Sequence, residues 1–391
     1  MSDRNTITDH RVQSAFALPD NGNEVLSTKV MFFCSGLATA AWAGIIPIIK
    51  ANTGIDDGTL GLLLLCLGMG AILSMPLAGA VATRVGCKLV LLVTLCVFSL
   101  LLMLLPLANT TAQLVLLLLG FGFGIGATDC VMNIQAILVE KRANKTLMSG
   151  FHGFYSLGGI AGAGLMVALL SSGVSAFHAC VLIGLAMMAS LVVFHKGLLP
   201  FANPKEGPAF ALPHGAVLLI GVICFSFFLA EGTVLDWSGV YLTEYQGAVH
   251  SNAVLGLFCF SITMTLGRLT GDKLTERLGA RLVLTLGGLL ASAGMFFAIA
   301  APDLYWALFG YALVGAGCAN IVPIMFSATG KQTSMPQAIA VPAVSTLGYI
   351  GVLAGPASVG LIAQQFSLPA ALYVITVLIA VATLLSLRVK I

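Results

Sequence analysis

The chain has 391 residues, of which 59% are hydrophobic and only 8% are charged, and its formal net charge is +3. Soluble domains carry about 25% charged residues, so this composition excludes an ordinary soluble enzyme and indicates a polytopic membrane protein. The small net charge and the lack of a basic cluster argue against a nucleic-acid partner. The nine cysteines are scattered singly through the chain, which predicts neither a metal site nor a disulfide framework, and we expect no cofactor.

The chain begins with a polar stretch of mixed charge that lacks the apolar core of a signal peptide, so we expect a cytoplasmic tail over residues 1–27. A helix that crosses a bilayer needs about 20 mostly apolar residues. Twelve such runs follow, which predicts an all-α fold with twelve transmembrane helices at 28–49, 58–82, 87–107, 111–138, 147–172, 175–195, 213–243, 249–274, 279–301, 303–329, 334–363 and 368–388.

The longest polar break, residues 196–212, is predicted to be a cytoplasmic linker between helical bundles at 28–195 and 213–391. With twelve spans, the Lys and Arg residues between spans fall on one side of the membrane, and Lys50 is the exception. The positive-inside rule therefore predicts that both termini are cytoplasmic.

The two halves of the chain repeat each other. FFCSGLATAAWAG, which starts at Phe32, matches FFLAEGTVLDWSG, which starts at Phe227, at an offset of 195 residues. Further matches join TRVGCKLVLL to ERLGARLVLT, GIGATD to GAGCAN, and SLGGI to TLGYI, and the last of these has an offset of 190 residues. This repeat predicts two pseudo-symmetric six-helix bundles in parallel orientation, as in transporters with a central site between the repeats.

The turns after the second and eighth spans share the pattern R-x-G-x-[KR], which begins at Arg84 and Arg277. With six plus six helices and a cytoplasmic mid-chain loop, this pattern resembles the major facilitator superfamily over the whole chain. The turns are similar to that superfamily's signature G-x-x-x-D-R-x-G-R-[RK]. Thr83 stands where the signature has an acid, and the second copy keeps Glu276. The resemblance implies that Arg84 and Arg277 take part in gating.

Two motifs, TDCVMN in the fourth span and ANIVPIMFSATG in the tenth, resemble the fucose-permease branch of proton-coupled sugar carriers. AEG…DW in the seventh span and FHGFYSLG in the fifth resemble its uncharacterised bacterial relatives. The resemblance implies a monomeric carrier in the bacterial inner membrane.

Asp129 lies near the predicted midplane of the fourth span, where an ionisable side chain is a functional hypothesis by default. Asn133 follows one turn later on the same face, and Gly122 and Gly126 continue this stripe, which we expect to line a cavity. The resemblance places an essential acid at Asp129 and a matching asparagine at Asn133. The repeat places Asn320 opposite Asp129, so one half alone would carry a coupling proton. A structural acid paired with a neighbouring helix is the alternative.

Glu231 and Asp236 both lie in the seventh span, about 140° apart around an α-helix. Glu231 is expected just above the midplane as a cavity acid, either a second protonation site or a substrate acceptor, with Asp129 as its partner across the cavity. Asp236 is expected near the outer interface beside Trp237, as a gating or an interfacial residue.

Other polar and aromatic residues are weaker candidates. Trp42 and Trp237 occupy equivalent places in the repeat and would stack on a sugar ring or lie at the membrane interface. His152 is either a gating residue or a structural one. Arg268 is expected to snorkel or anchor near the inner end of its span. Further substrate candidates are Tyr155, Asn320 and Tyr349, and Pro356 is expected to allow a kink that serves gating.

These observations favour secondary active uptake of a sugar, polyol or similar small polar solute by proton symport. Proton-coupled export of drugs or metabolites is the main alternative, and a non-transporting receptor is the third. The sequence shows no phosphate-binding loop, HExxH or GxSxG motif, so we expect neither an enzyme nor direct ATP drive. The expected partners are a small-molecule substrate, protons and the lipid bilayer.

Overall fold

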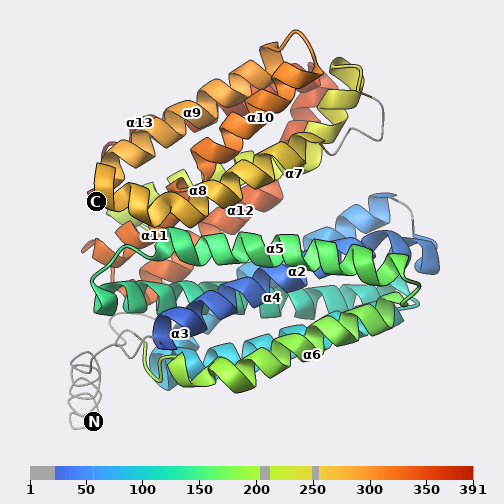
Figure 1. Ribbon diagram of the computed structural model, residues 1–391, viewed down its shortest axis with the longest axis vertical. Helices are drawn as coiled ribbons and strands as arrows, with labels where there is room; N and C mark the ends of the chain where they lie inside the picture. Colours follow the sequence, from blue (N-terminus) through green and yellow to red (C-terminus); the bar gives the residue numbers. More distant parts are fainter. Residues whose placement is uncertain (1–22, 56, 203–211, 249–254, 391) are drawn as a thin grey trace. The chain divides into compact units, whose positions relative to one another are not determined.

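The computed structural model describes residues 23–55, 57–202, 212–248 and 255–390 (Figure 1). Its contacts divide the chain into two compact units. Unit 1 consists of the residues up to Lys145, Phe154–Ala211 and Pro336–Pro342, and unit 2 consists of Thr146–Gly153, Leu212–Met335 and Ala343–Ile391.

Unit 1 is built from helices that follow the N-terminal half of the chain (Figure 1). These are α2 (Asn23–Thr53), α3 (Asp57–Leu104), η1 (Leu105–Leu107), α4 (Thr111–Ala143), α5 (Met148–Ser171) from Phe154 onward, α6 (Ala176–Phe194) and η2 (His195–Gly197). Helices α2 and α3 each pack against α4 and α6. Thr110 caps α4 and Ser175 caps α6 by accepting backbone N–H groups, as expected for these residue types at helix starts.

A break inside α3 lies at Gly86, whose φ of 85° and ψ of 161° are not helical. The sequence predicted separate spans at 58–82 and 87–107, and the structure reduces the break between them to this turn. A β-carbon at Gly86 would collide with the carbonyl group of Pro200, so the position requires glycine for both its conformation and its space. Gly279, its counterpart in the repeat, has a similar φ of 81° and ψ of 145° at the start of α9 (Ala280–Ala300).

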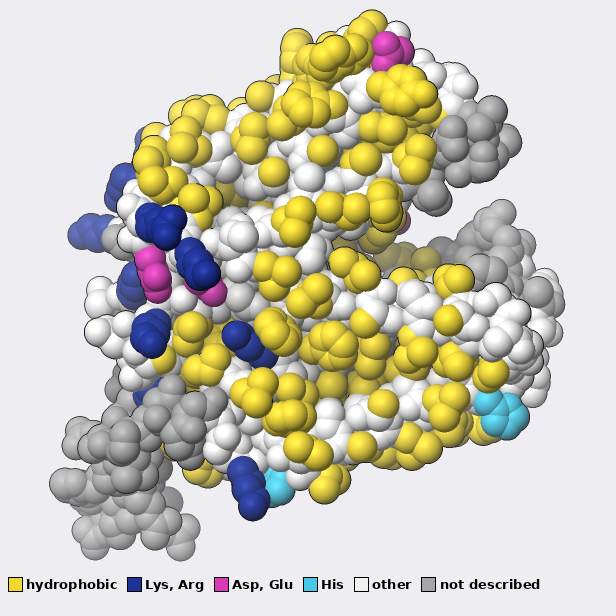
Figure 2. All heavy atoms as spheres, in the orientation of Figure 1, with side chains coloured by type: hydrophobic (Ala, Val, Ile, Leu, Met, Phe, Trp, Pro, Cys, Tyr) yellow, Lys and Arg dark blue, Asp and Glu magenta, His cyan; other side chains and the backbone are white. Residues whose placement is uncertain are grey.

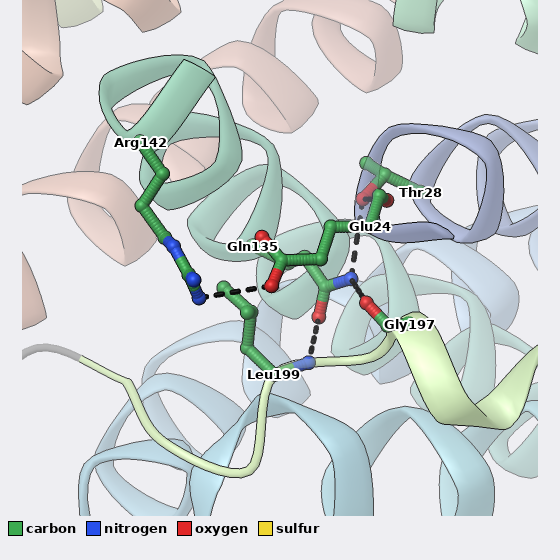
Figure 3. Close-up of polar contacts among 6 residues, drawn as sticks. All are labelled: Glu24, Thr28, Gln135, Arg142, Gly197 and Leu199. Atoms are coloured by element: carbon green, nitrogen blue, oxygen red, sulfur yellow. Dashed lines mark hydrogen bonds and ion pairs between the residues drawn. The ribbon is translucent and has the colours of Figure 1, made fainter. Parts of the chain in front are cut away.

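The start of the predicted linker is bound to unit 1 through Gln135 of α4 (Figure 3). The Gln135 amide donates to Thr28 Oγ1 at 3.1 Å and to the Gly197 carbonyl at 3.4 Å. Its Oε1 atom accepts the Leu199 N–H at 3.1 Å. Beside this group, Arg142 Nη1 forms an ion pair with Glu24 at 2.9 Å.

The turn at the break in α3 also holds the linker. The N–H groups of Cys87 and Lys88 donate to the carbonyls of Phe201 and Leu199, at 3.3 and 2.8 Å. Of the predicted linker at 196–212, the part up to Ala202 is therefore an integral part of unit 1, and residues 203–211 lie outside the described residues.

Unit 2 contains the helices of the C-terminal half and the first turn of α5 (Figure 1). Helix α9 packs against α10 and α13, α8 packs against α10, and α7 packs against α11 and α13. The other bounds are α7 (Gly215–Tyr245), α8 (Leu255–Leu278), α10 (Leu304–Cys318), α11 (Ile321–Lys331), α12 (Gln337–Gln365), which belongs to unit 2 from Ala343 onward, and α13 (Leu368–Ser386).

The span predicted at 303–329 is broken into α10 and α11. Pro323 explains the break, because it has no N–H to donate to the carbonyl of Ala319 four residues earlier. The counterpart of this span in the repeat, α4, carries Met132 at the place equivalent to Pro323 and is continuous.

Apolar side chains cover much of the face shown in Figure 2. Leu62, Val192 and Leu384 are 65%, 74% and 65% exposed. Ten helices of the described chain are long and apolar enough to cross a membrane, and they include Leu62–Leu107 as one although Gly86 breaks it. The more polar α8 is not among the ten. The chain is thus a multi-pass helical membrane protein, and twelve remains the predicted number of spans.

Candidate functional site

Two acceptor groups lie together on α4 in unit 1. Asn133 is 1% exposed, and its amide nitrogen donates to the backbone carbonyl of Asp129 at 2.9 Å. Its Oδ1 atom is buried and accepts no hydrogen bond from the described residues. The carboxylate of Asp129 is partly exposed, and within the described part of the chain it forms neither a hydrogen bond nor an ion pair.

The glycines on the same stripe of α4 do not line a cavity, contrary to the sequence prediction. A β-carbon at Gly122 would collide with the carbonyl group of Leu67, and one at Gly126 would collide with that of Ala71. Both glycines therefore allow α4 to approach the backbone of α3 closely. The stripe is a packing surface up to Gly126.

A buried ion pair joins α7 to α8 in unit 2. Arg268 Nη2 lies 3.3 Å from both carboxylate oxygens of Glu231. The side chains of Arg268 and Glu231 are 7% and 16% exposed. The prediction that Arg268 snorkels is wrong, because its guanidinium is buried and pairs with an acid; the alternative, an anchoring role, stays a prediction.

The break between α10 and α11 supplies a further acceptor to Arg268. Its Nε atom donates to the Ala319 carbonyl at 3.3 Å, which is the carbonyl that Pro323 leaves without a helical donor. Asn320, at the same break, donates from Nδ2 to the Gly267 carbonyl at 3.1 Å. The irregular backbone of this span thus helps to hold the guanidinium in place.

The first turn of α5 packs against α8 within unit 2. The carboxylate of Asp272 accepts the N–H groups of Ser149 and Gly150 at 2.9 and 2.8 Å. His152 is 8% exposed, and its ring lies 5.8 Å from that of Phe326. It also interacts electrostatically with Arg268. Asp272 therefore satisfies N–H groups that have no acceptor inside the helix.

The acid at the signature-like position does not make this contact. Glu276 is exposed, one turn of α8 beyond Asp272. Sequence comparison with the signature drew attention to Glu276 and missed Asp272, although Asp272 lies four residues after Arg268 on the same helical face.

The remaining candidates occupy varied places. Trp42 is 5% exposed, and its ring lies 6.0 Å from that of Phe121. Tyr155 donates to Thr39 Oγ1 at 3.4 Å. The ring of Trp237 packs near Gly360, and its buried Nε1 donates to none of the described residues. Three other candidates, Asp236, Arg84 and Arg277, are exposed. Tyr349 is half-buried, and Pro356 lies within α12.

Asp129 belongs to unit 1 and Glu231 to unit 2, so the pairing expected between them stays a prediction. What the structure adds is a partner for Glu231 that the sequence analysis missed. The signal was present in the sequence: a buried arginine in an apolar span needs an anion, and Glu231 is an acid in the adjacent span. Among the described residues, no three His, Cys, Asp or Glu side chains form a group that could hold a metal ion.

Comparison with known proteins agrees with this architecture. The family model of the Major Facilitator Superfamily matches two overlapping stretches, residues 30–257 and 222–390. An uncharacterised MFS-type transporter of Yersinia pestis is 45% identical over 350 residues, which cover 89% of this chain and 91% of the relative. Membrane protein MosC of Rhizobium meliloti is 30% identical over 384 residues, which cover 96% of this chain and 93% of MosC.

Two solved structures share the fold. The E. coli fucose:proton symporter FucP has a TM-score of 0.76 at 15% identity, over 94% of this chain and 98% of FucP. The human organic anion transporter MFSD10 has a TM-score of 0.78 at 15% identity, over 94% of this chain and 100% of MFSD10. At such identities the likeness concerns the fold alone.

Proposed function

Because the chain belongs to the Major Facilitator Superfamily, and is therefore a secondary transporter of small molecules and not an enzyme, we propose that it couples a small polar solute to protons. The solute is a sugar, a polyol or a similar molecule, and the coupling is symport. Asp129 and Glu231 are the proton-coupling residues, and Asn133 binds the solute.

The observation that carries this proposal is the pair of unused acceptors on α4. A carboxylate without a counter-charge inside a membrane span is costly, and so is a buried amide oxygen without a donor. Asp129 is discharged when it takes up a proton, and Asn133 Oδ1 is satisfied when a solute hydroxyl donates to it. A solute rich in hydroxyl groups suits these acceptors.

The other acid has a different setting. Glu231 faces the guanidinium of Arg268, so a proton on Glu231 leaves a buried cation without its anion. We assign Asp129 as the residue whose proton crosses the membrane with the solute. Glu231 is then a second protonation site whose charge is tied to that of Arg268.

The family relatives guide the choice of solutes. FucP shares the fold and is a fucose:proton symporter, so L-fucose is the first solute to test. The distribution of Lys and Arg supports an orientation with both termini in the cytoplasm. A monomer in the bacterial inner membrane is part of the same proposal.

Uptake into liposomes that hold the purified protein tests the proposal. L-Fucose, myo-inositol and D-glucosamine are screened with and without an inward proton gradient. We expect at least one of them to accumulate only with the gradient, and Asp129→Asn to exchange that solute without accumulating it. Glu140→Gln, near the end of the same helix, is the matched control and should accumulate it normally. Accumulation that ignores the gradient in the wild type, or no transport of any of the three, contradicts the proposal.

A further inference from the structure

Three charged residues of unit 2 lie between α7 and the start of α5. Glu231 lies on α7, Arg268 and Asp272 lie one turn apart on α8, and Asp272 binds the first turn of α5. We propose that Arg268 exchanges its guanidinium between Glu231 and Asp272, and thereby ties the protonation of Glu231 to the anchoring of α5. This inference builds on the proposed role of Glu231 in proton coupling.

The ion pair between Arg268 and Glu231 is long enough for Arg268 to exchange Glu231 for another acid. Both Nη2 to oxygen distances are 3.3 Å, whereas charge-assisted hydrogen bonds of this type are about 2.7–2.9 Å. Asp272 is four residues from Arg268, a spacing that lets an arginine and an acid pair along one helix face. The guanidinium therefore has a second carboxylate within reach on its own helix.

The contact of Asp272 with α5 is tight and specific. Each of its carboxylate oxygens accepts one N–H, from Ser149 and from Gly150, and a carboxylate at a helix start is also favoured by the helix dipole. Glycines allow this approach: a β-carbon at Gly153 would lie 2.8 Å from Leu269 Cδ2, and one at Gly271 would lie 2.9 Å from Ser149 Cβ. The first turn of α5 thus rests directly on the α8 backbone.

A proton that binds to a Glu231 carboxylate oxygen removes the anion that faces Arg268. Of the other titratable groups near this pair, His152 is a base, and Cys224 and Cys318 are thiols within range of the Glu231 charge. None of them replaces a carboxylate, whereas Asp272 does. As the guanidinium turns to Asp272, the carboxylate is drawn from the N–H groups of α5, and the first turn of that helix loosens.

In this relay Arg268 is a positioning residue, since it acts through the two acids. The prediction is a specific dependence: neutralising Glu231 loosens α5 when Arg268 is present and has no effect when Arg268 is absent. If Arg268 has only a structural role, replacing it should loosen α5 further, in addition to the effect of replacing Glu231.

Hydrogen exchange of the peptide that covers residues 147–154, in the full-length purified protein, tests the relay. Glu231→Gln imitates the protonated acid. We expect it to speed exchange of the Ser149 and Gly150 amides about tenfold, which corresponds to the loss of one charge-assisted hydrogen bond. This rate should approach the exchange rate in Asp272→Asn. Arg268→Gln with Glu231→Gln should restore slow exchange. Glu276→Gln, one turn from Asp272, is the matched control and should exchange like the wild type.

Two results overturn the relay. One is that Glu231→Gln exchanges as slowly as the wild type while Asp272→Asn exchanges fast. The other is that Glu231→Gln and the double variant with Arg268→Gln exchange equally fast. If Glu231→Gln does not fold, the wild type itself serves. Its exchange, corrected for the intrinsic effect of pH, should rise as the pH falls, and Arg268→Gln should abolish this rise. The measurement needs neither solute nor gradient, so failed uptake in liposomes with an intact exchange response refutes the proposed function and leaves the relay standing.

Discussion

At the scale of single residues, two amides on α4 show how differently the same chemical group is used. Gln135 is fully buried, and its side chain makes three hydrogen bonds within unit 1. Asn133, two residues earlier, makes one bond to its own helix and leaves Oδ1 without a donor from the described residues. A satisfied amide serves the fold, and an unsatisfied one is available to a ligand.

This contrast yields a prediction for the pair Asn133→Ala and Gln135→Ala. We expect Asn133→Ala to raise the KM of the solute about tenfold, the effect of one lost hydrogen bond, with little change in melting temperature. Gln135→Ala should cost about 1–3 kcal/mol of stability, because it strands the Leu199 N–H and the Gly197 carbonyl. Uptake kinetics and thermal unfolding measure the two effects, and the reverse pattern would contradict these roles.

The sequence located Asp129, Glu231 and Asn133 as candidates because polar groups are rare in apolar spans. It missed the pairing of Arg268 with Glu231, since hydropathy does not give the direction of a side chain. The link from Pro323 through the Ala319 carbonyl to Arg268 depends on which helices are neighbours, and one sequence does not contain that information.

At the scale of elements, the repeated turns after the second and eighth spans share a backbone conformation but not a setting. Gly86 and Gly279 have φ values of 85° and 81°. The space beside Gly86 is filled by Pro200, whereas a β-carbon at Gly279 would meet nothing within 4 Å. The sequence identified the two turns as equivalent, and it gave no sign that the linker packs on the first of them.

Replacing each of these glycines by alanine separates backbone strain from crowding. A positive φ of this kind costs a residue with a side chain about 1–3 kcal/mol, so both variants should lower the melting temperature. Gly86→Ala should lower it further, because its β-carbon also displaces the Pro200 carbonyl. Equal losses in thermal unfolding would show that the linker contact contributes no stability.

At the scale of the whole molecule, the apolar runs predicted an all-helical membrane protein and the resemblance implied the Major Facilitator Superfamily, and both are confirmed. The chain order alone did not reveal that Thr146–Gly153 and Pro336–Pro342, which correspond in the repeat, group with the unit of the opposite sequence half. For the first turn of α5, the grouping reflects close packing at Gly150 and the hydrogen bonds that Asp272 accepts. These residues are unremarkable in the sequence.

We propose that solute and proton cross the membrane together and that Asp129 carries the proton. Liposomes with a trapped pH-sensitive dye and no initial pH gradient test it directly, with the solute that the uptake screen selects added outside. We expect the lumen of wild-type liposomes to acidify as the solute enters, and Asp129→Asn to let the solute in without acidification. Solute entry at constant lumenal pH in the wild type, or undiminished acidification in Asp129→Asn, would contradict the proposal.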